Sequence, residues 1–195
     1  GKDTITKSVV VNYAPSANFF GSNSCAQESV SFTNLSTIAS GTISSYEWDF
    51  DDGFKDNTKS PKHAFANDGS YSVQLKAFTA AGCVDSITQT VSIYELPKVS
   101  FTANDACFGD AVTFTNGTTI SSGSLSYNWN FGDGFSSSSK SPSYTYSSDG
   151  TYDVTLKAIS NNFCEALETK TLKIKSAPNV SFTAADTCAG LFVRI

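Results

Sequence analysis

Three aspartates, Asp49, Asp51 and Asp52, fall within four residues of a tryptophan-containing segment. Several carboxylate oxygens are what a hard cation such as Ca²⁺ requires, so this cluster is a calcium candidate. A matching segment 81 residues later keeps only Asp133 of these carboxylates. A calcium site common to both segments would not lose most of its ligands. The Asp-Gly pair in each segment instead favours a tight turn, and we expect no bound metal.

His63 is the single histidine of the chain, and it aligns with Tyr144 in the second of the two matching segments. The position therefore does not need an imidazole, and the two segments share no Ser-His-Asp triad. No glycine-rich phosphate loop follows a strand and opens a helix. We expect no catalytic residues and no cofactor, so the chain is predicted not to be an enzyme.

Composition narrows the class of protein further. The chain has 195 residues and no Met. Its net charge of -5 argues against a nucleic-acid partner, because binding phosphates needs a basic face. No apolar run approaches the roughly 20 residues of a membrane helix, so we expect no membrane insertion in this segment. Ser, Thr, Asn and Gly are abundant, charged residues make up 16%, and no 3.6-residue apolar period is sustained. These features predict a piece of a longer all-β protein that is extracellular, either secreted or on the cell surface.

The chain repeats itself. Residues 46–53 (YEWDFDDG) recur as residues 127–134 (YNWNFGDG), and residues 68–77 (DGSYSVQLKA) recur as residues 149–158 (DGTYDVTLKA). The period is 82 residues before Trp48 and 81 after it, so one extra residue lies between Thr33 and Tyr46, in a stretch expected to be a loop.

This period divides the chain into four parts. Residues 1–13 align with the end of a repeat and are predicted to form the last strand of a preceding copy. Residues 14–95 and 96–176 are two complete repeats, and residues 177–195 begin a following, truncated copy.

Within each repeat, apolar and polar residues alternate in short runs separated by turn signals, which is typical of half-buried antiparallel strands. Strands of this kind predict an immunoglobulin-like β-sandwich. Trp48 and Trp129 are the expected core anchors, and Tyr71 and Tyr152, just after Asp-Gly, are the expected corner residues.

The run Trp-(Asp/Asn)-Phe-(Gly/Asp)-Asp-Gly, followed by Ser-Pro-x-(His/Tyr)-x-(Phe/Tyr) and Asp-Gly-(Ser/Thr)-Tyr-x-Val-x-Leu, resembles the signature of the PKD (polycystic kidney disease) domain. The motif occurs twice in register and spans nearly all of residues 14–176. It departs from the family pattern at Asp51, where Gly is usual, and at Asn130, where Asp is usual. The resemblance implies tandem immunoglobulin-like, PKD-type antiparallel β-sandwiches.

Tandem PKD repeats with a regular cysteine pattern are also similar to those in large surface adhesins of gliding bacteria exported by the type IX system. In that group, Asp-(Ser/Thr)-apolar triplets accept O-linked sugars. Two aligned triplets here, Asp3-Thr4-Ile5 and Asp85-Ser86-Ile87, resemble such acceptors, so Thr4 and Ser86 are glycosylation candidates.

Five cysteines in an extracytoplasmic chain predict disulfides. Pairs within each repeat would be Cys25–Cys83 and Cys107–Cys164, leaving Cys188 without a partner. In an immunoglobulin-like sandwich, however, these partners lie at opposite ends, on the order of 20–30 Å apart, whereas a disulfide needs Cα atoms within about 7 Å. A head-to-tail array favours Cys25–Cys164 across the junction, with the other three cysteines paired to repeats outside this chain. Within-repeat pairs and free thiols are the alternatives.

Two functions fit these observations. The first is a structural stalk that spaces an adhesive tip from the cell, within a surface adhesin or filament used for attachment or gliding motility. Its partners would be neighbouring repeats of the same chain. The second is an accessory module of a secreted multidomain protein that binds surface polysaccharide or other cell-surface proteins. Loop aromatics such as Phe54 and Phe135 would serve that role.

Overall fold

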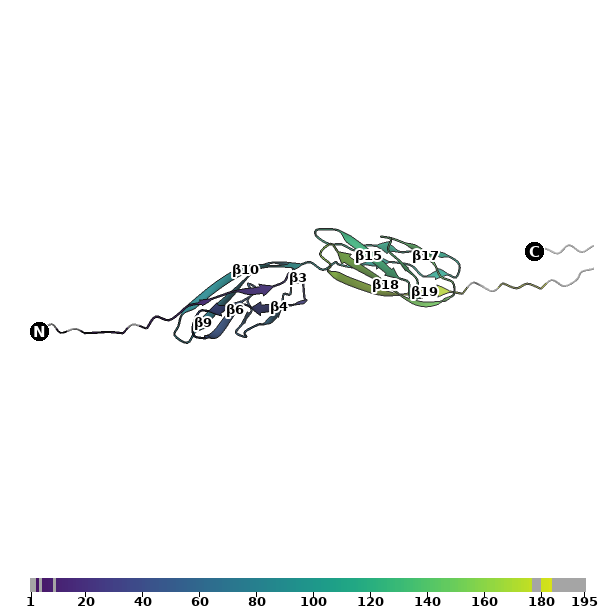
Figure 1. The fold of residues 1–195 in the computed structure, drawn as a ribbon. Helices are drawn as coiled ribbons and strands as arrows, with labels where there is room; N and C mark the ends of the chain where they lie inside the picture. The colour runs from purple at the N-terminus through teal and green to yellow at the C-terminus, as the bar shows by residue number, and fades with distance from the viewer. Residues whose placement is uncertain (1–2, 4, 9, 177–179, 184–195) are drawn as a thin grey trace, which may run out of the picture.

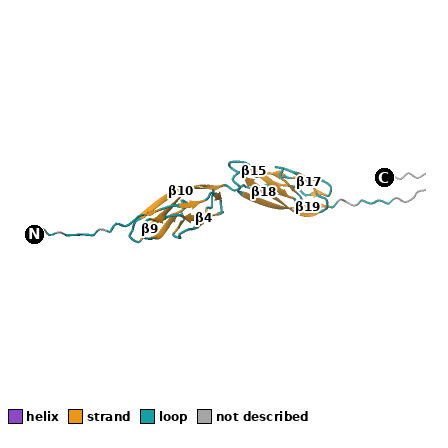
Figure 2. Ribbon diagram, viewed as in Figure 1, coloured by secondary structure: helices purple, strands orange, loops and turns teal. Residues whose placement is uncertain are grey.

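Two β-sandwiches lie end to end, joined by a short linker (Figures 1 and 2). The computed structural model describes residues 3, 5–8, 10–176 and 180–183, and these residues contain strands but no helix. The tandem all-β architecture is therefore the predicted one.

The larger sheet of each sandwich has five strands in an order that is identical in the two repeats. Its centre is a long antiparallel hairpin, β9 (Gly69–Thr79) with β10 (Val84–Tyr94) in repeat one and β18 (Gly150–Ser160) with β19 (Glu165–Lys175) in repeat two. The first sheet has the order β3 (Ser24–Cys25), β10, β9, β6 (Ile43–Asp49), β7 (Lys55–Asp56). The second has the order β12 (Ala106–Cys107), β19, β18, β15 (Leu125–Asn130), β16 (Ser136–Ser137).

The opposing layer is built from shorter strands. In repeat one it contains β2 (Phe19–Gly21), β4 (Ser29–Asn34) and β8 (Lys62–Ala64), with β1 (Pro15–Ser16) paired to β5 (Thr37–Ile38). In repeat two it contains β11 (Phe101–Thr102) paired to β14 (Thr115–Asn116), and β13 (Ala111–Thr113) paired to β17 (Ser143–Thr145).

The first strand of each repeat changes sheets, a feature that the alternation pattern alone does not predict. In repeat two, β11 pairs with β14, and four residues later β12 pairs with β19. The β12–β19 pairing, like β3–β10 in repeat one, is parallel, so each sandwich is not purely antiparallel. Because of this switch, Cys25 and Cys107 lie beside the last residues of the long hairpins, Tyr94 and Lys175.

The extra residue of repeat one lies in a strand and not in the expected loop. The pairing of β6 with β9 shifts register between Ile43 and Ser45, whereas β15 pairs with β18 without a shift. Ser44 is therefore a β-bulge, which lets one strand carry an additional residue without changing the face of those that follow. Its hydroxyl donates a hydrogen bond to the Phe78 carbonyl at 3.0 Å.

The flanking segments form no strand where they are described. Residues 1–13 are predicted to be a last strand, but their described part lies outside any strand and is exposed, and no described strand pairs with it. The predicted start of a following repeat, residues 177–195, is described only at residues 180–183, which also lie outside strands. Cys188 lies outside the described residues.

A fully buried tryptophan occupies the centre of each core. Trp48 and Trp129 are both 0% exposed. Each indole N–H donates to a loop carbonyl, that of Thr58 or Ser139, at 3.0 Å, which satisfies the one polar group of the ring. The surrounding buried residues occupy equivalent positions in the two repeats: Phe19, Val30, Phe32, Phe50, Phe65, Val73, Leu75, Val91 and Ile93 in repeat one, and Phe101, Val112, Phe114, Phe131, Tyr146, Val154, Leu156, Leu172 and Ile174 in repeat two.

The two corner tyrosines close the turns before the long hairpins. The hydroxyl of Tyr71 donates to the Asn67 carbonyl, and that of Tyr152 donates to the Ser148 carbonyl, both at 3.0 Å. This is the geometry that their position after Asp-Gly predicts.

Replacing Trp129 with Ala is expected to destabilise repeat two by about 3–5 kcal/mol, because the lost ring leaves a large cavity between the sheets. Phe135→Ala is the control: this ring is 62% exposed, and its loss should change stability by about 0.5 kcal/mol or less. Urea denaturation, with hydrogen exchange in β18 as the reporter of repeat two, measures both. Equal effects of the two substitutions would contradict the placement of Trp129 in the core.

Candidate functional site

A disulfide connects the two repeats at their junction. Cys25, in β3 of repeat one, is bonded to Cys164, which precedes β19 of repeat two, with a Cα–Cα distance of 5.6 Å. Both residues are buried, at 7% and 0% exposure. This is the junction pairing that the head-to-tail topology favours. Among the described cysteines, Cys83 and Cys107 carry free thiols, so neither within-repeat pair is formed.

The linker between the repeats is held by a second set of contacts. The carboxylate of Glu95 accepts hydrogen bonds from the Ser121 backbone N–H, at 2.8 Å, and from the Ser121 hydroxyl. These bonds, with a smaller contribution from Lys98, lower the pKa of Glu95 below its usual value. Lys98 and Thr119 exchange two backbone hydrogen bonds, at 2.9 and 3.1 Å. Leu96 packs against the core of repeat one and Pro97 is buried, so the linker has little freedom to bend.

The aspartates of the calcium candidate are committed to a turn. Asp49 accepts the Asp51 backbone N–H at 3.1 Å and forms an ion pair with Lys55, also at 3.1 Å. These contacts lower the pKa of Asp49, the backbone hydrogen bond most. Asp52 accepts the N–H of Phe54 at 3.1 Å. Within the described residues, no three His, Cys, Asp or Glu side chains are grouped as metal ligands would be.

The same turn tolerates Asp51 in repeat one and Gly132 in repeat two because both adopt a left-handed backbone, with φ of 64° and 86°. A Cβ atom on Gly132 would lie 2.8 Å from the Asp153 carbonyl oxygen. Asp51 offsets its own strained conformation with a hydrogen bond, because its carboxylate accepts the Ser72 N–H at 2.9 Å. The departure of Asp51 from the family pattern is therefore compensated locally. Asn130, at the position of Asp49, keeps the hydrogen bond of the turn, since its side-chain oxygen accepts the Gly132 N–H at 2.9 Å.

His63 and Tyr144 perform one structural role with two different side chains. His63 Nε2 lies 2.6 Å from an Asp52 oxygen, and its ring stacks on Phe50 with centroids 4.2 Å apart. The Tyr144 hydroxyl donates to Asp133 at 2.7 Å, and its ring stacks on Phe131, also at 4.2 Å. The shared role is to tie the Asp-Gly turn to the opposing layer, which explains why the position does not require an imidazole.

Phe54 and Phe135, at the tip of this turn, are exposed. Their exposed fractions are 66% and 62%, and each lies near the ring of its partner, His63 or Tyr144, at 5.7 and 6.1 Å between centroids. These two rings therefore present an aromatic face to solvent at matching positions of the two repeats.

Of the two glycosylation candidates, Thr4 lies outside the described residues. Ser86 is exposed on β10, at a part of that strand that pairs only with β9. The neighbouring Asp85 has a structural use, because its carboxylate accepts the Ala17 backbone N–H at 2.8 Å and so holds the first strand of repeat one. Sequence reasoning did not find this contact, since repeat two has Ala166 at the corresponding position.

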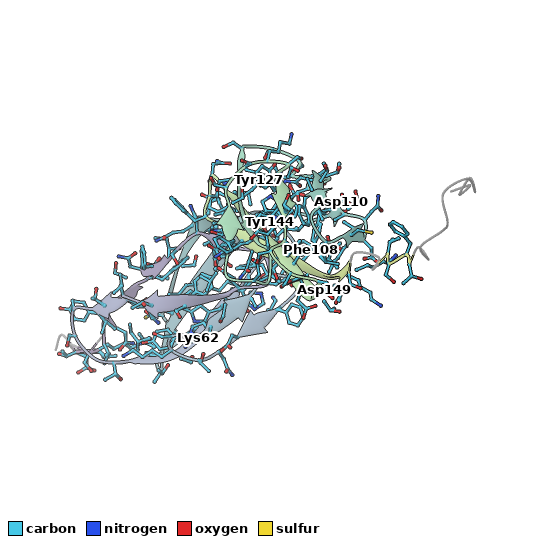
Figure 3. The ribbon with its side chains drawn as sticks, turned by 90° about the vertical axis from the view of Figure 1, so that its right-hand side faces the viewer. Lys62, Phe108, Asp110, Tyr127, Tyr144 and Asp149 are labelled. Carbon is cyan, nitrogen blue, oxygen red and sulfur yellow. A yellow bond between two sulfur atoms is a disulfide. The ribbon has the colours of Figure 1, made fainter. Side chains whose placement is uncertain are left out.

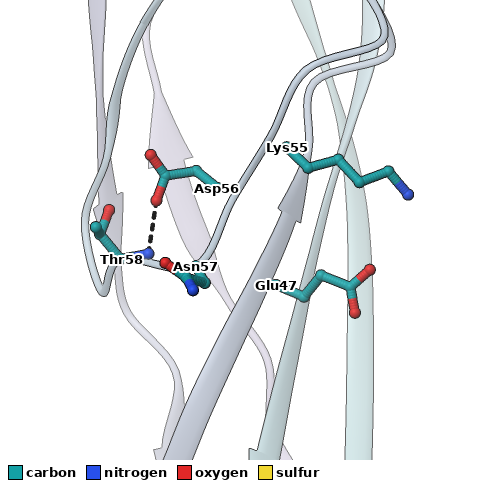
Figure 4. Close-up of a pocket in the computed structure, with 5 residues that line it drawn as sticks. All are labelled: Glu47, Lys55, Asp56, Asn57 and Thr58. Atoms are coloured by element: carbon teal, nitrogen blue, oxygen red, sulfur yellow. Dashed lines mark hydrogen bonds between the residues drawn. The ribbon is translucent and has the colours of Figure 1, made fainter.

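An open hollow on repeat one lies beside β6 and β7. Figure 4 shows its lining residues, among them Glu47, Lys55 and Asp56. The Asp56 carboxylate accepts the Thr58 backbone N–H at 2.6 Å, and this bond lowers the pKa of Asp56. Lys55 forms its ion pair with Asp49, outside the hollow, and the residues that line the hollow present no nucleophile paired with a base. In the described part of the chain, no helix is long and apolar enough to cross a membrane.

Two sandwiches with matching tryptophan cores and corner tyrosines, joined by a disulfide, define a tandem immunoglobulin-like repeat protein. A model of the PKD domain family matches the chain twice, at residues 12–94 and 95–175. The chain therefore belongs to the PKD domain family.

The relatives of the chain include a bacterial metalloprotease that has a PKD domain. Pre-pro-metalloprotease PrtV of Vibrio cholerae is 30% identical over 175 residues, which are 88% of this chain and 18% of that protein. The PKD1 domain of the Vibrio cholerae metalloprotease PrtV, a crystal structure, is 34% identical, with a TM-score of 0.39, and the match covers 41% of this chain and 96% of that domain. The PKD1 domain of Vibrio anguillarum Epp is 27% identical, with a TM-score of 0.40, and the match covers 43% and 99%. The chain thus spans 18% of the length of the curated relative.

The left-handed turn residue provides a test of the site geometry. Asp51→Ala and Asp51→Gly both remove the acceptor of the Ser72 N–H, but only Gly adopts a positive φ without steric cost. We expect Asp51→Gly to be more stable than Asp51→Ala by about 1 kcal/mol. Urea denaturation followed by Trp48 emission, in a Trp129→Phe background, measures the difference. If Asp51→Gly is the less stable variant, the strain assigned to this position is wrong.

Alkaline pH should unfold repeat two before repeat one. Burial raises the pKa of Tyr144 to about 12, with a further contribution from the hydrogen bond to Asp133, and burial also raises the pKa of Tyr146. In the unfolded chain both hydroxyls ionise near pH 10. Their stabilising contribution is therefore complete below pH 10 and is lost as the pH rises from 10 towards 12 and above. Repeat one has His63 and Phe65 at these positions.

Single-tryptophan variants separate the two repeats in this experiment. Trp48→Phe leaves Trp129 to report on repeat two, and Trp129→Phe leaves Trp48 to report on repeat one. The Tyr144→His/Tyr146→Phe double variant, which installs the side chains of repeat one, should reduce the difference between the two alkaline midpoints. Coincident midpoints in the two single-tryptophan variants, with Tyr144 and Tyr146 unchanged, would refute the assignment.

Proposed function

We propose that the two repeats act as a stiff, non-catalytic spacer in a longer extracellular protein. In its more specific form, the proposal is that they are part of the structural stalk of a large cell-surface adhesin or filament, used for surface attachment or gliding motility. The observation that carries it is the Cys25–Cys164 disulfide across the junction.

The junction is fixed at separate points. The disulfide holds one side, and the hydrogen bonds from Ser121 to Glu95 hold the linker side. Two attachments at separate points limit both bending and rotation between the repeats, whereas a single flexible linker limits neither. A restrained orientation suits a module whose task is to set distance, because the length of such an array grows with the number of repeats.

The disulfide and the family membership support an extracellular location, because disulfides persist in oxidising compartments and are rare where thiols are kept reduced. Glycosylation of Ser86 and Thr4 belongs to the same proposal. The exposed Ser86 hydroxyl is compatible with modification. The neighbouring repeats of the same chain are the first partners that this arrangement implies.

The alternative is an accessory module that binds carbohydrate or protein for a secreted multidomain protein. The observation that favours it is the pair of exposed rings, Phe54 and Phe135, at equivalent positions of the two repeats. Exposed aromatic faces can stack on sugar rings, and two of them on one rigid array would act together.

Exchange of the repeats in the full-length protein distinguishes the two functions. Residues 14–176 are replaced by two unrelated, rigid β-sandwich domains of similar length, and attachment of cells bearing the protein to a surface is measured. A spacer should keep most of its attachment after the exchange, because only length and stiffness matter. A binding module should lose attachment, both in the exchange variant and in the Phe54→Ala/Phe135→Ala variant.

Deletion of residues 14–176 without replacement provides the matching control. A spacer should lose reach on deletion, so attachment should fall and then recover when the unrelated domains are inserted. Unchanged attachment after deletion would refute the spacer function. Loss that the inserted domains do not restore would favour the binding module.

A further inference from the structure

The junction uses one end of each repeat, and the equivalent free ends carry the same features without a partner. At the junction, Cys25 and Ala26 are 7% and 6% exposed. Their counterparts at the free end of repeat two, Cys107 and Phe108, are exposed, Phe108 at 45%. Figure 3, in which this end faces the viewer, shows the side chains of Phe108 and Asp110 there.

The backbone around the free thiol of Cys107 already has the conformation that it has around bonded Cys25. Cys25 pairs in parallel with Tyr94 and Cys107 with Lys175, one period apart. The residue after each cysteine donates its N–H to the last residue of the long hairpin, Ala26 to Tyr94 at 2.9 Å and Phe108 to Lys175 at 2.8 Å. This half of the junction is therefore preformed at the end of repeat two.

The other half of the junction is preformed at the opposite end, in repeat one. Cys164 accepts the Ser160 N–H at 2.9 Å, and its own N–H donates to the Ser160 hydroxyl at 3.1 Å. Cys83 makes the same two bonds with Thr79, at 2.9 and 3.1 Å. Cys83 is partly exposed where Cys164 is buried.

A surface hollow lies at this same end of repeat one. It is lined by the linker residues Asn12 and Tyr13, by Ser40 and Gly41, and by Thr79 and Ala80. Tyr13 aligns with Glu95, which at the junction contacts repeat two. The hollow therefore occupies the position where a preceding repeat would meet repeat one, as repeat one meets repeat two.

We propose that Cys83 and Cys107 are halves of further junction disulfides, each formed with another copy of this repeat. Cys107 pairs with the cysteine equivalent to Cys164 in the following copy, and Cys83 pairs with the cysteine equivalent to Cys25 in the preceding one. Every junction of the array then carries one disulfide, and we call this series of bonds the disulfide ladder. This inference deepens the proposed spacer function by naming the partner of each free end.

The bond forms by oxidation of two thiols. The Sγ–Sγ bond forms as the two thiols lose two protons and two electrons, and a disulfide-containing oxidant, either a small molecule or a thiol–disulfide oxidoreductase, accepts the electrons and is reduced to two thiols. The folded ends bring the two sulfur atoms together, so correct pairing follows from docking of the repeats.

A three-repeat chain tests the proposal directly. Residues 1–176 are followed by a second copy of residues 96–176, which supplies a complete third repeat in register. The added copy carries Cys107→Ser and, at an exposed position, Leu167→Val, so that its cysteine peptide differs in mass from that of repeat two. The chain is refolded in a glutathione redox buffer, free thiols are blocked by alkylation, and the peptides are mapped without reduction. We expect a peptide that joins Cys107 of repeat two to the Cys164 copy of repeat three, while Cys25–Cys164 is retained between repeats one and two.

Serine at the added Cys164 copy is the matched control, and it should return Cys107 to the alkylated pool without affecting the first junction. In the parent three-repeat chain, alkylated Cys107, or a Cys107–Cys164 bond within repeat two, would overturn the ladder. The same mapping on the full-length protein extends the test to Cys83. The result is independent of the exchange experiment, because the ladder can form in an array that binds ligands, and a spacer can function without it.

Discussion

The packing of the indole ring at the centre of each repeat is the interaction on which the rest of the sandwich depends. Burial of a tryptophan between two sheets is costly unless its N–H finds a partner, and the carbonyls of Thr58 and Ser139 provide one in the two repeats. These carbonyls belong to the loops that follow the Asp-Gly turns. Burial of the ring therefore fixes that loop as well as the sheet spacing, and the edge-to-face contacts with Phe19 and Phe101, at 5.1 and 5.0 Å, repeat the same arrangement.

The repeats conserve geometry more closely than they conserve residue types. A histidine and a tyrosine fill one stacking position, and an aspartate and a glycine share one left-handed backbone position. In each pair, the hydrogen bond or the steric freedom that the position requires is supplied by a different chemical group. A cluster of aspartates in one repeat is therefore explained by turn geometry, and the sequence difference between the repeats carries no evidence of separate chemistry.

Much of the fold could be predicted from the sequence because the period-two patterns and the 81-residue repeat report directly on burial. The core positions of Trp48 and Trp129 follow from those patterns. Other features depend on contacts that have no periodic signature. The sheet switch at β11 and β12, the bulge at Ser44 and the hydrogen bond from Ala17 to Asp85 involve single residues in one repeat or a short irregular segment.

The junction disulfide is a part of the candidate site that could be predicted from the sequence. Spacing alone permits several pairings of five cysteines, but strand direction places Cys25 and Cys164 at facing ends of adjacent sandwiches. The hydrogen bonds from Ser121 to Glu95 could not be predicted in this way, because the equivalent positions one period earlier are Tyr13 and Ala39, which cannot form them.

The position of the disulfide also decides how the chain responds when it is pulled from its two ends. Tension that enters at the first residues reaches Cys25, crosses the sulfur bridge to Cys164 and leaves along β19. Residues 26–163 lie outside this path. At roughly 3.3–3.6 Å per residue, they would otherwise add about 450–500 Å of extension if both sandwiches came apart. The bridge removes that length from the stretched chain, so under tension these two repeats can lengthen only through the segments outside residues 26–163, which include β2 and β19.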